Sequence, residues 1–323
     1  MDLQDITQPI EQELKHFNDH FRSALRSKIA FVDLIARYIV KRKGKKIRPA
    51  LVFLTAKACG EVNETTYRGA SLVEILHTAT LIHDDVIDDA DTRRGFASIN
   101  ANWKNKIAVL MGDYMLAKGL LLSLDNNDFR FLKITSDAVR RMSEAEILQI
   151  KKSRDLDIDE PTYLKIISDK TASLLSTCCQ IGASSVTTDE QIIGHMREFG
   201  ENIGMVFQIR DDLLDYTGKK SITGKPAGLD MKEKKLTLPL IHAMSRAPRR
   251  QSNDILKIIK NGASKKELNA IVDFVHEFGG IEYASKKAEY YSTIAQEALH
   301  RLDRSPAKDS LSSFVDYVME RRK

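Results

Sequence analysis

The chain has 323 residues, of which 42% are hydrophobic and 29% are charged, so its composition is that of a globular protein and not of a disordered one. The net charge of +5 is too small to indicate a nucleic-acid partner unless the basic residues cluster. No stretch approaches about eighteen consecutive apolar residues, and the start of the chain is acidic and amphipathic, unlike a signal peptide. We therefore expect a cytoplasmic protein without a transmembrane segment.

Glycine and proline are sparse, and apolar residues recur at intervals of three and four, as in Ile107, Leu110, Met111 and Tyr114. This spacing predicts helix nearly throughout, and no segment alternates strongly enough to predict a strand. Length alone favours two domains, but a helical fold can keep this many residues around one core, so we expect an all-α protein with a single domain over residues 1–323. The predicted helices span 4–24, 29–42, 47–59, 64–90, 104–123, 127–152, 161–182, 188–217, 234–245, 250–260, 265–276, 278–302 and 308–322.

A basic run lies between the second and third predicted helices. From Lys41 to Arg48, six of eight residues are Lys or Arg, and the run leads into a helix whose N-terminus could add backbone donors to an anion. The alternative is a nucleic-acid or localisation patch, but aromatic residues are rare here and no DNA-binding motif is present. The run is better explained as a phosphate site.

The predicted helix 64–90 carries the aspartate pattern Asp84-Asp85-Val86-Ile87-Asp88. Residues four apart share a helix face, so Asp84 and Asp88 form a carboxylate pair. Mg²⁺ prefers oxygen ligands and is usually held by one or two carboxylates plus substrate phosphates. A solvated helix face is the alternative, but the apolar residues from Ile75 to Ile87 argue against it, because an unpaired carboxylate is rarely buried.

The same pattern returns as Asp211-Asp212-Leu213-Leu214-Asp215 in the predicted helix 188–217. Two such helices facing one another could hold a diphosphate through Mg²⁺ ions. The segment Gly218 to Lys235 follows, with three glycines, a proline and six lysines. A mobile basic lid and a solvated surface loop explain this composition equally well.

Several further motifs, taken together, give the chain a resemblance to a known family. They are Gly44-Lys45-Lys46-Ile47-Arg48-Pro49, the stretch from Glu74 to His83 before the first aspartates, Arg93-Arg94-Gly95, Gly112-Asp113, Glu146-Ile147-Leu148-Gln149, Lys170-Thr171, Phe207-Gln208-Ile209-Arg210, Gly224-Lys225-Pro226 and Thr237-Leu238-Pro239. In this combination the chain resembles the all-trans polyprenyl diphosphate synthases. The resemblance implies an antiparallel helical bundle of the isoprenoid synthase type with a central active-site cavity.

The resemblance also implies a reaction, namely head-to-tail condensation of isopentenyl diphosphate with an allylic diphosphate such as farnesyl or geranylgeranyl diphosphate. Three Mg²⁺ ions would assist ionisation of the allylic substrate, and an apolar pocket would protect the resulting cation from water. Attack by the alkene and loss of a proton would follow. The family resemblance further implies a homodimer, with no nucleic-acid partner.

Residue roles follow from the same resemblance, position by position. Asp84, Asp88 and Asp211 resemble the main Mg²⁺ ligands, with Asp85, Asp212 and Asp215 as ligands or as partners through water. Lys45, Arg48, His77 and Arg94 resemble the site for the diphosphate of isopentenyl diphosphate. Arg93, Lys170, Lys225 and Lys235 resemble the allylic diphosphate site, with Thr171 and Gln208 steadying the cation and its diphosphate. The predicted catalytic residues are Lys170, Thr171 and Gln208 together with Asp84 and Asp211.

Two histidines near the first aspartate motif have alternative explanations. His77 lies seven residues before Asp84, on nearly the same helix face, so it could point into the cavity, although isolated histidines are often satisfied core residues. His83 immediately precedes Asp84. We expect His83 to pack in the core or to contact a metal ligand without binding the metal, because a metal phosphohydrolase would need further histidine ligands.

Product length is predicted from the residues one helical turn before the first aspartates, Ala79 and Thr80. Small residues there leave room for a growing chain, so this sequence resembles the longer-chain enzymes that make heptaprenyl to octaprenyl products and supply quinone side chains. Replacement of Ala79 by Phe should then shorten the products. A geranylgeranyl or farnesyl diphosphate synthase is the first alternative, followed by a class I terpene cyclase and a silent partner subunit.

Overall fold

The computed structural model describes residues 2–41, 44–93, 95–217, 231 and 233–321. Within these ranges almost all regular structure is helical, as predicted. The elements are α1 (Leu3–Thr7), η1 (Gln8–Ile10), α2 (Glu11–Ala24), α3 (Ala30–Lys41), α4 (Ile47–Cys59), α5 (Glu64–Ile87), β1 (Thr92–Arg93), β2 (Phe96–Ala97), α6 (Ile99–Leu124), α7 (Phe129–Asp155), α8 (Glu160–Ile167), η2 (Ser168–Ala172), α9 (Ser173–Ser184), α10 (Glu190–Thr217), α13 (Leu238–Arg246), α14 (Arg249–Asn261), α15 (Lys265–Glu277), α16 (Gly280–His300) and α17 (Pro306–Met319).

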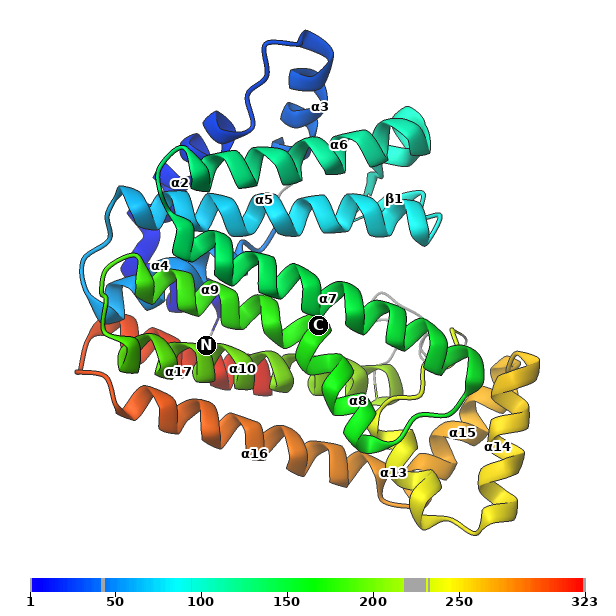
Figure 1. Ribbon diagram of the computed structural model, residues 1–323. Coiled ribbons are helices and arrows are strands. Elements are labelled where there is room, and N and C mark those ends of the chain that lie inside the picture. Colours follow the sequence, from blue (N-terminus) through cyan, green and yellow to red (C-terminus); the bar gives the residue numbers. More distant parts are fainter. Residues whose placement is uncertain (1, 42–43, 94, 218–230, 232, 322–323) are drawn as a thin grey trace.

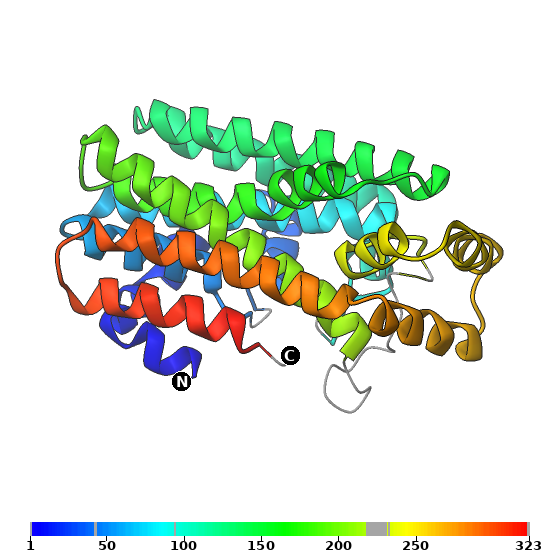
Figure 2. The same cartoon turned by 90° about the horizontal axis from the view of Figure 1, so that it is seen from below.

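The long helices form a layered bundle. Helices α5 and α6 lie side by side along one edge, α7 and α9 follow, and α10 packs against both α9 and α16 (Figure 1). Helices α13, α14 and α15 gather at one end, which is also clear in the view from below (Figure 2). One apolar core joins α1 to α7 with α9, α10 and α17, and a second lies among α8, the end of α10 and α13 to α16. The all-α bundle is confirmed, whereas the single-domain organisation stays a prediction.

Three of the predicted helices differ from the observed ones. The first predicted helix is broken into α1, η1 and α2 around Pro9, because proline has no N–H to donate within a helix. Helix α5 ends at Ile87, ahead of Asp89, whose φ of 48° lies in the left-handed region. The predicted helix 161–182 contains a π-helical turn, η2, between α8 and α9.

A small hairpin contradicts the expectation that the chain has no strands. Strands β1 and β2 pair antiparallel, with Thr92 opposite Ala97 and Arg93 opposite Phe96. Gly95 between them has a φ of +78°, a conformation that glycine adopts without steric cost. Period-two patterning could not reveal this hairpin, since each strand has only two residues.

Helix α6 has the length and apolar composition of a membrane-spanning helix, the one described helix for which this holds. Its most apolar window has a mean hydropathy of 1.6, and a third of that window is buried in the protein. The backbone is non-helical at Lys104, which coincides with the predicted start of this helix. Core helices of soluble proteins pass the same test of length and composition, so the absence of a transmembrane segment stays a prediction.

Candidate active site

The first aspartate motif lies at the C-terminal end of α5, and its carboxylates face different surroundings. Asp84 is half-buried and Asp88, the C-cap residue, is exposed, whereas only 1% of Asp85 is exposed. Burial raises the pKa of Asp84, the negative charges of Glu146 and Asp88 raise it further, and Lys170 opposes them. Asp84 and Asp88 are therefore close enough to act as a pair, while Asp85 has another partner.

That partner is Arg93, which the β hairpin places beside α5. The Nε atom of Arg93 donates to Oδ1 of Asp85, while the buried Oδ2 has no hydrogen-bond partner among the described residues. Asp85 and Arg93 line a cavity together with Lys46 and His77. Arg94 lies outside the described residues.

The basic run contributes a different lysine to this cavity from the one predicted. Lys45 is exposed, whereas Lys46 lines the cavity and its Nζ donates to Oδ1 of Asn18. Burial lowers the pKa of Lys46, and the nearby Glu74 carboxylate opposes that shift. Arg48 is half-buried and lies within electrostatic range of Cys178. The sequence indicated the basic run, but it did not indicate which of the two neighbouring lysines lines the cavity.

The second aspartate motif, near the C-terminal end of α10, also contains one buried carboxylate. Asp212 is 4% exposed and accepts hydrogen bonds from the Tyr163 hydroxyl at 2.6 Å and from Nε2 of Gln208 at 2.7 Å. Gln208 in turn accepts from the hydroxyl of Thr171 at 2.8 Å. Sequence reasoning missed Tyr163, which carries no motif of its own.

The outer carboxylates of the second motif are more accessible. The Asp211 side chain is 46% exposed and forms an ion pair with Nη1 of Arg321 at 3.3 Å, while Asp215 is half-buried. The Arg321 guanidinium also lies over the Phe207 ring, 4.4 Å from its centroid. Arg321 near the C-terminus is a second residue that the sequence did not indicate.

Lys170 lies between the two aspartate motifs. Its Nζ donates to Oε1 of Gln149 at 2.6 Å and pairs with Glu146, and its charge acts on Asp84. A cavity of about 120 Å³ brings Lys170 together with Thr171, Gln208, Asp212 and Lys235. Most of the predicted allylic-diphosphate residues therefore surround one space. Lys225 lies outside the described residues, as does most of the basic segment from Gly218 to Lys235.

The two predicted chain-length residues face different helices. Thr80 lines a small apolar cavity of about 10 Å³ between α5, α7 and α9, whose other lining residues are Val73, Leu76, His77, Thr135, Ala138, Val139, Met142, Leu174 and Thr177. Ala79 is fully buried and lies one turn from Ile75 and from His83, both of which pack against α6 at its glycines. Ala79 therefore faces α6, and the cavity is on the Thr80 side of α5.

His83 has the packing role that was expected of it. A Cβ atom at Gly112 would lie 2.1 Å from Nε2 of His83, so the ring fills the space that this glycine leaves between α5 and α6. The same nitrogen lies 3.3 Å from the carbonyl oxygen of Val109 and 3.4 Å from Oδ1 of Asp113. These contacts hold the ring against α6.

The two aspartate motifs fit a hard divalent cation that is shared with a substrate. Their accessible atoms are carboxylate oxygens, and the buried Oδ2 of Asp85 has an unused lone pair. Among the described residues, no group of three His, Cys, Asp or Glu side chains could hold a metal by itself. Mg²⁺ in proteins commonly completes its coordination with water and phosphate oxygens.

Comparison with known proteins identifies the same chemistry. Residues 30–275 match the profile of the polyprenyl synthetase family. The chain is 34% identical to an all-trans-nonaprenyl-diphosphate synthase (geranyl-diphosphate specific) of Rhodobacter capsulatus, over 98% of both chains. It is 33% identical to the octaprenyl diphosphate synthase of Escherichia coli, over 99% of both chains. These relatives are prenyltransferases.

Solved structures of prenyl diphosphate synthases are also similar to this chain. A decaprenyl diphosphate synthase from Rhodobacter capsulatus has a TM-score of 0.92 at 31% identity, over 100% of both chains. A polyprenyl synthase from Caulobacter crescentus, complexed with calcium and isoprenyl diphosphate, has a TM-score of 0.90 at 30% identity, over 100% of this chain and 98% of that one. A geranylgeranyl pyrophosphate synthase from Bacteroides thetaiotaomicron has a TM-score of 0.83 at 34% identity, over 99% of this chain and 100% of that one.

Proposed function

Because this chain belongs to the polyprenyl synthetase family and is a prenyltransferase, we propose that it condenses isopentenyl diphosphate with an allylic diphosphate. Farnesyl or geranylgeranyl diphosphate would be the allylic substrate. One observation carries the proposal: Lys170 and its neighbours lie between two aspartate motifs and line one cavity. An anionic substrate that bridges divalent cations and this lysine would satisfy both groups.

The allylic diphosphate would lie between the aspartates and the cationic side chains. Asp84, Asp88, Asp211 and Asp215 would hold Mg²⁺, and the bound ions would supply positive charge to the diphosphate as it leaves. Arg93, Lys170 and Lys235 would contact its oxygens directly. Lys170 and Lys235 already have carboxylate partners, Glu146 and Glu233, from which a diphosphate would have to attract them.

Asp85 and Asp212 would act chiefly by orienting other groups. Asp85 holds Arg93 next to the first motif, and Asp212 holds Gln208, whose amide oxygen accepts from Thr171. The hydroxyl of Thr171 and the amide of Gln208 would place their dipoles beside the allylic carbon. We therefore assign both buried aspartates to positioning, with contact to Mg²⁺ through water.

Isopentenyl diphosphate would bind at a second cavity, beside α5. Lys46 and His77 line this cavity and offer a cation and a hydrogen-bonding ring for its diphosphate, and Arg93 of the allylic set lies at the same cavity. Arg48 and Lys45, in the same basic run, would approach from α4 and the segment before it. We add Lys46 to the residues that would bind isopentenyl diphosphate because it lines this cavity.

The reaction would break the allylic C–O bond, with the electron pair leaving on the diphosphate. The alkene of isopentenyl diphosphate would then attack the allylic carbon, and a proton from the adjacent carbon would pass to the released diphosphate. Apolar side chains around Thr80, including Leu76 and Met142, would keep water from the cation. The product is a diphosphate that is five carbons longer.

We infer a medium-to-long product, in the range of heptaprenyl to octaprenyl diphosphate. The curated relatives named above make octaprenyl and nonaprenyl diphosphates. Thr80, Thr135 and Ala138 are small residues in the cavity that the chain would enter. The cavity of about 10 Å³ is too small for a prenyl chain, so Leu76 and Met142 would have to change rotamer as the product grows. Geranylgeranyl diphosphate is the second candidate, favoured by the likeness to the Bacteroides enzyme.

We also propose that the protein is a homodimer that uses the outer face of α6. The large apolar side chains Val109, Leu110, Leu120, Leu121 and Leu124 are 41 to 55% exposed there. Large exposed apolar patches mark protein–protein contact sites, and we take this helix face as one. A cytoplasmic location remains part of the proposal on the basis of composition.

The proposed reaction is tested with the purified chain, farnesyl diphosphate, labelled isopentenyl diphosphate and Mg²⁺. We expect labelled polyprenyl diphosphates of several added units, none in the presence of a chelator and almost none for Asp84→Ala. Products from farnesyl diphosphate alone would indicate a cyclase, and no product from the pure chain would indicate a partner subunit. Either result would refute the proposal.

A further inference from the structure

The π-helical turn η2 shapes the wall of the cavity. It spans Ser168–Ala172 between α8 and α9, and the backbone N–H of Ser173 donates to the carbonyl oxygen of Ser168, five residues earlier. Such turns are rare, and they occur frequently at functional sites. Lys170 and Thr171, which line the cavity, are both within this turn. Their direction therefore depends on the turn keeping its shape.

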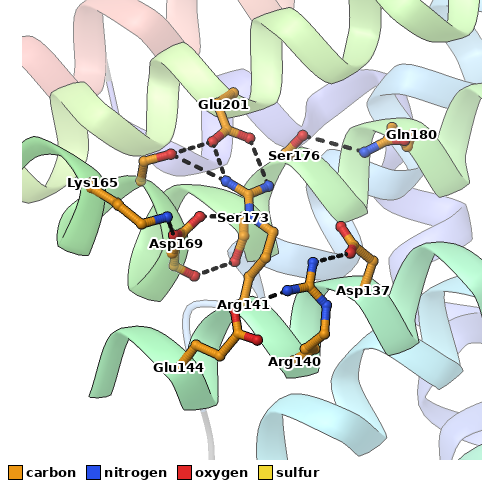
Figure 3. Close-up of polar contacts among 11 residues, drawn as sticks. Asp137, Arg140, Arg141, Glu144, Lys165, Asp169, Ser173, Ser176, Gln180 and Glu201 are labelled. Carbon is orange, nitrogen blue, oxygen red and sulfur yellow. Dashed lines mark hydrogen bonds and ion pairs between the residues drawn. The ribbon is translucent and has the colours of Figure 1, made fainter. Parts of the chain in front are cut away.

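The side of η2 away from the cavity is held by Arg141 of α7 (Figure 3). Its Nε donates to Oδ1 of Asp169 at 2.7 Å, and its Nη2 donates to the Ser168 hydroxyl at 3.1 Å and to Oε1 of Glu201 at 2.7 Å. The Ser168 hydroxyl also donates to Glu201 at 2.6 Å, and Lys165 donates to Oδ2 of Asp169 at 2.9 Å. Arg141 thus joins α7, η2 and α10.

The first and second halves of the turn point in different directions. Asp169 is bound to Arg141 and Lys165, and its backbone carbonyl accepts from the Ser173 hydroxyl at 2.6 Å. Lys170 and Thr171 instead face Gln149 and Gln208 at the cavity. A rotation of the turn that released Asp169 would therefore also swing Lys170 away from its place between the aspartate motifs.

Close packing of α10 brings Glu201 into this network. A Cβ atom at Gly204 would lie 2.4 Å from Cα of Ala172, and one at Gly200 would lie 2.6 Å from Cα of Ser176. These two glycines flank Glu201 on the helix face that approaches η2 and α9. The short helix separation that they allow places the Glu201 carboxylate within reach of Arg141.

The charges in the network are balanced and mostly buried. The side chains of Arg141, Glu201 and Asp169 are 25%, 28% and 12% exposed, and the more exposed Lys165 supplies the second cation. Hydrogen-bonded ion clusters often add little net stability over apolar packing, and their best-attested use is to specify one arrangement of the chain. The arrangement in contact with this cluster is the π-helical turn.

We propose that Arg141 is a positioning residue, which through Asp169 and Glu201 holds η2 in the shape that directs Lys170 into the cavity. The proposal rests on the proposed function, because it takes Lys170 to bind the allylic diphosphate. Arg141 itself touches no substrate. It acts on binding of the allylic substrate and leaves the isopentenyl diphosphate site, at the cavity lined by Lys46 and His77, unchanged.

The experiment measures binding of farnesyl thiolodiphosphate, an unreactive allylic analogue, by calorimetry with Mg²⁺ for Arg141→Met. We expect about tenfold weaker binding, the effect of misdirecting one charge-assisted hydrogen bond, with an unchanged KM for isopentenyl diphosphate. In a Lys170→Ala background, Arg141→Met should change the Kd by less than about twofold. Arg140→Met is the matched control, because Arg140 pairs only with the exposed Asp137 and Glu144 among the described residues. It should bind like the wild type.

Each other outcome has a defined meaning. Wild-type affinity of Arg141→Met, or an equal loss in both backgrounds, would overturn the proposal, since Arg141 would then not act through Lys170. If Arg141→Met does not fold, the near-isosteric Asp169→Asn and Glu201→Gln decide the question in the same cycle with Lys170→Ala. A wild-type chain that binds the analogue but makes no product would refute the proposed reaction and not the role of Arg141.

Discussion

The hydroxyl of Tyr163 on α8 donates a hydrogen bond to Oδ2 of Asp212 on α10, across 2.6 Å. Both residues are almost completely buried, and the other Asp212 oxygen accepts from Gln208. The middle aspartate of the second motif is therefore fixed by neighbours before any cation binds. Asp85 and Arg93 form the corresponding pair in the first motif.

Replacement of Tyr163 by Phe should lower the affinity for Mg²⁺ and the allylic substrate while the fold is kept. The loss of a hydrogen bond to a charged group costs about 1.5–3 kcal/mol, and it frees Asp212 and Gln208 to rotate. We expect a fall in kcat/KM of about tenfold or more, measured with farnesyl diphosphate as the varied substrate.

The control for this substitution is Tyr283→Phe. Tyr283 donates to the Glu160 carboxylate at 2.8 Å, but Glu160 does not line the cavity that contains Lys170. Removal of the Tyr283 hydroxyl should change Tm and leave kcat/KM near the wild-type value. Equal losses of activity in both variants would mean that Tyr163 acts only through general stability.

Substitution of neighbouring aspartates should have opposite effects on the stability of the metal-free protein. Burial and the charges of Glu146 and Asp88 raise the pKa of Asp84, so ionising this carboxyl costs more in the folded chain than in the unfolded one. Asp84→Asn should therefore raise Tm in chelator, by a modest amount because the carboxylate is partly solvated. Asp85→Asn should lower Tm, because the half-buried Arg93 loses its charged partner. The free energy of unfolding should fall by about 1–3 kcal/mol.

Thermal unfolding with and without Mg²⁺ checks this pair of predictions. Asp84→Asn should also lose most of the stabilisation that Mg²⁺ gives the wild type, because ligands that bind the native state add to its stability. A lower Tm for Asp84→Asn in chelator would show that the carboxylate has a structural partner which its surroundings do not reveal.

The Arg141 network should make the free energy of unfolding depend on pH in the acid range. Although burial opposes ionisation of Asp169, its hydrogen bonds from Lys165 and Arg141 prevail and lower its pKa below the ordinary 3.8. A lowered carboxyl pKa contributes stability that is fully present above the unfolded value and is lost as pH falls through the folded one. The difference in unfolding free energy between wild type and Asp169→Asn should thus be constant above about pH 5 and shrink below 3.8. Urea titrations across this range test it, and a difference that grows in acid would contradict it.

The outer face of α6 should control assembly. A charge at Leu121, whose side chain is 50% exposed, would be desolvated in a dimer but not in a monomer. We expect Leu121→Glu to shift the mass measured by light scattering from twice 36.5 kDa toward 36.5 kDa. Tyr290→Glu, on α16 at the opposite edge of the bundle in Figure 1, should leave the mass unchanged. A wild-type monomer would end the homodimer proposal.

Features that depend on local sequence were predictable here. The 3.6-residue periodicity predicted the long helices, and the spacing of Asp84 and Asp88 gave their common face. Tyr163 and Asp212 are 49 residues apart in sequence, and Arg141 and Glu201 are 60 apart, so their contacts depend on how the helices pack. No sequence motif identifies such pairs of residues. Lys46 lines the cavity although Lys45 was predicted, and its backbone at the start of α4 is left-handed, which the sequence did not indicate.

The final prediction separates Ala79 from Thr80, which differ by about 100° around α5. Thr80→Phe would fill the apolar cavity between α5, α7 and α9, so the product should be several isoprene units shorter, with little loss of turnover. Ala79→Phe would instead press on α6, where overpacking costs about 1–3 kcal/mol of stability. The test is chromatography of the products together with Tm for both variants, and Thr80→Val, which is similar in size to the wild type, is the control. The result shows on which side of α5 the product grows. Stable Ala79→Phe protein with short products would place the growing chain between α5 and α6.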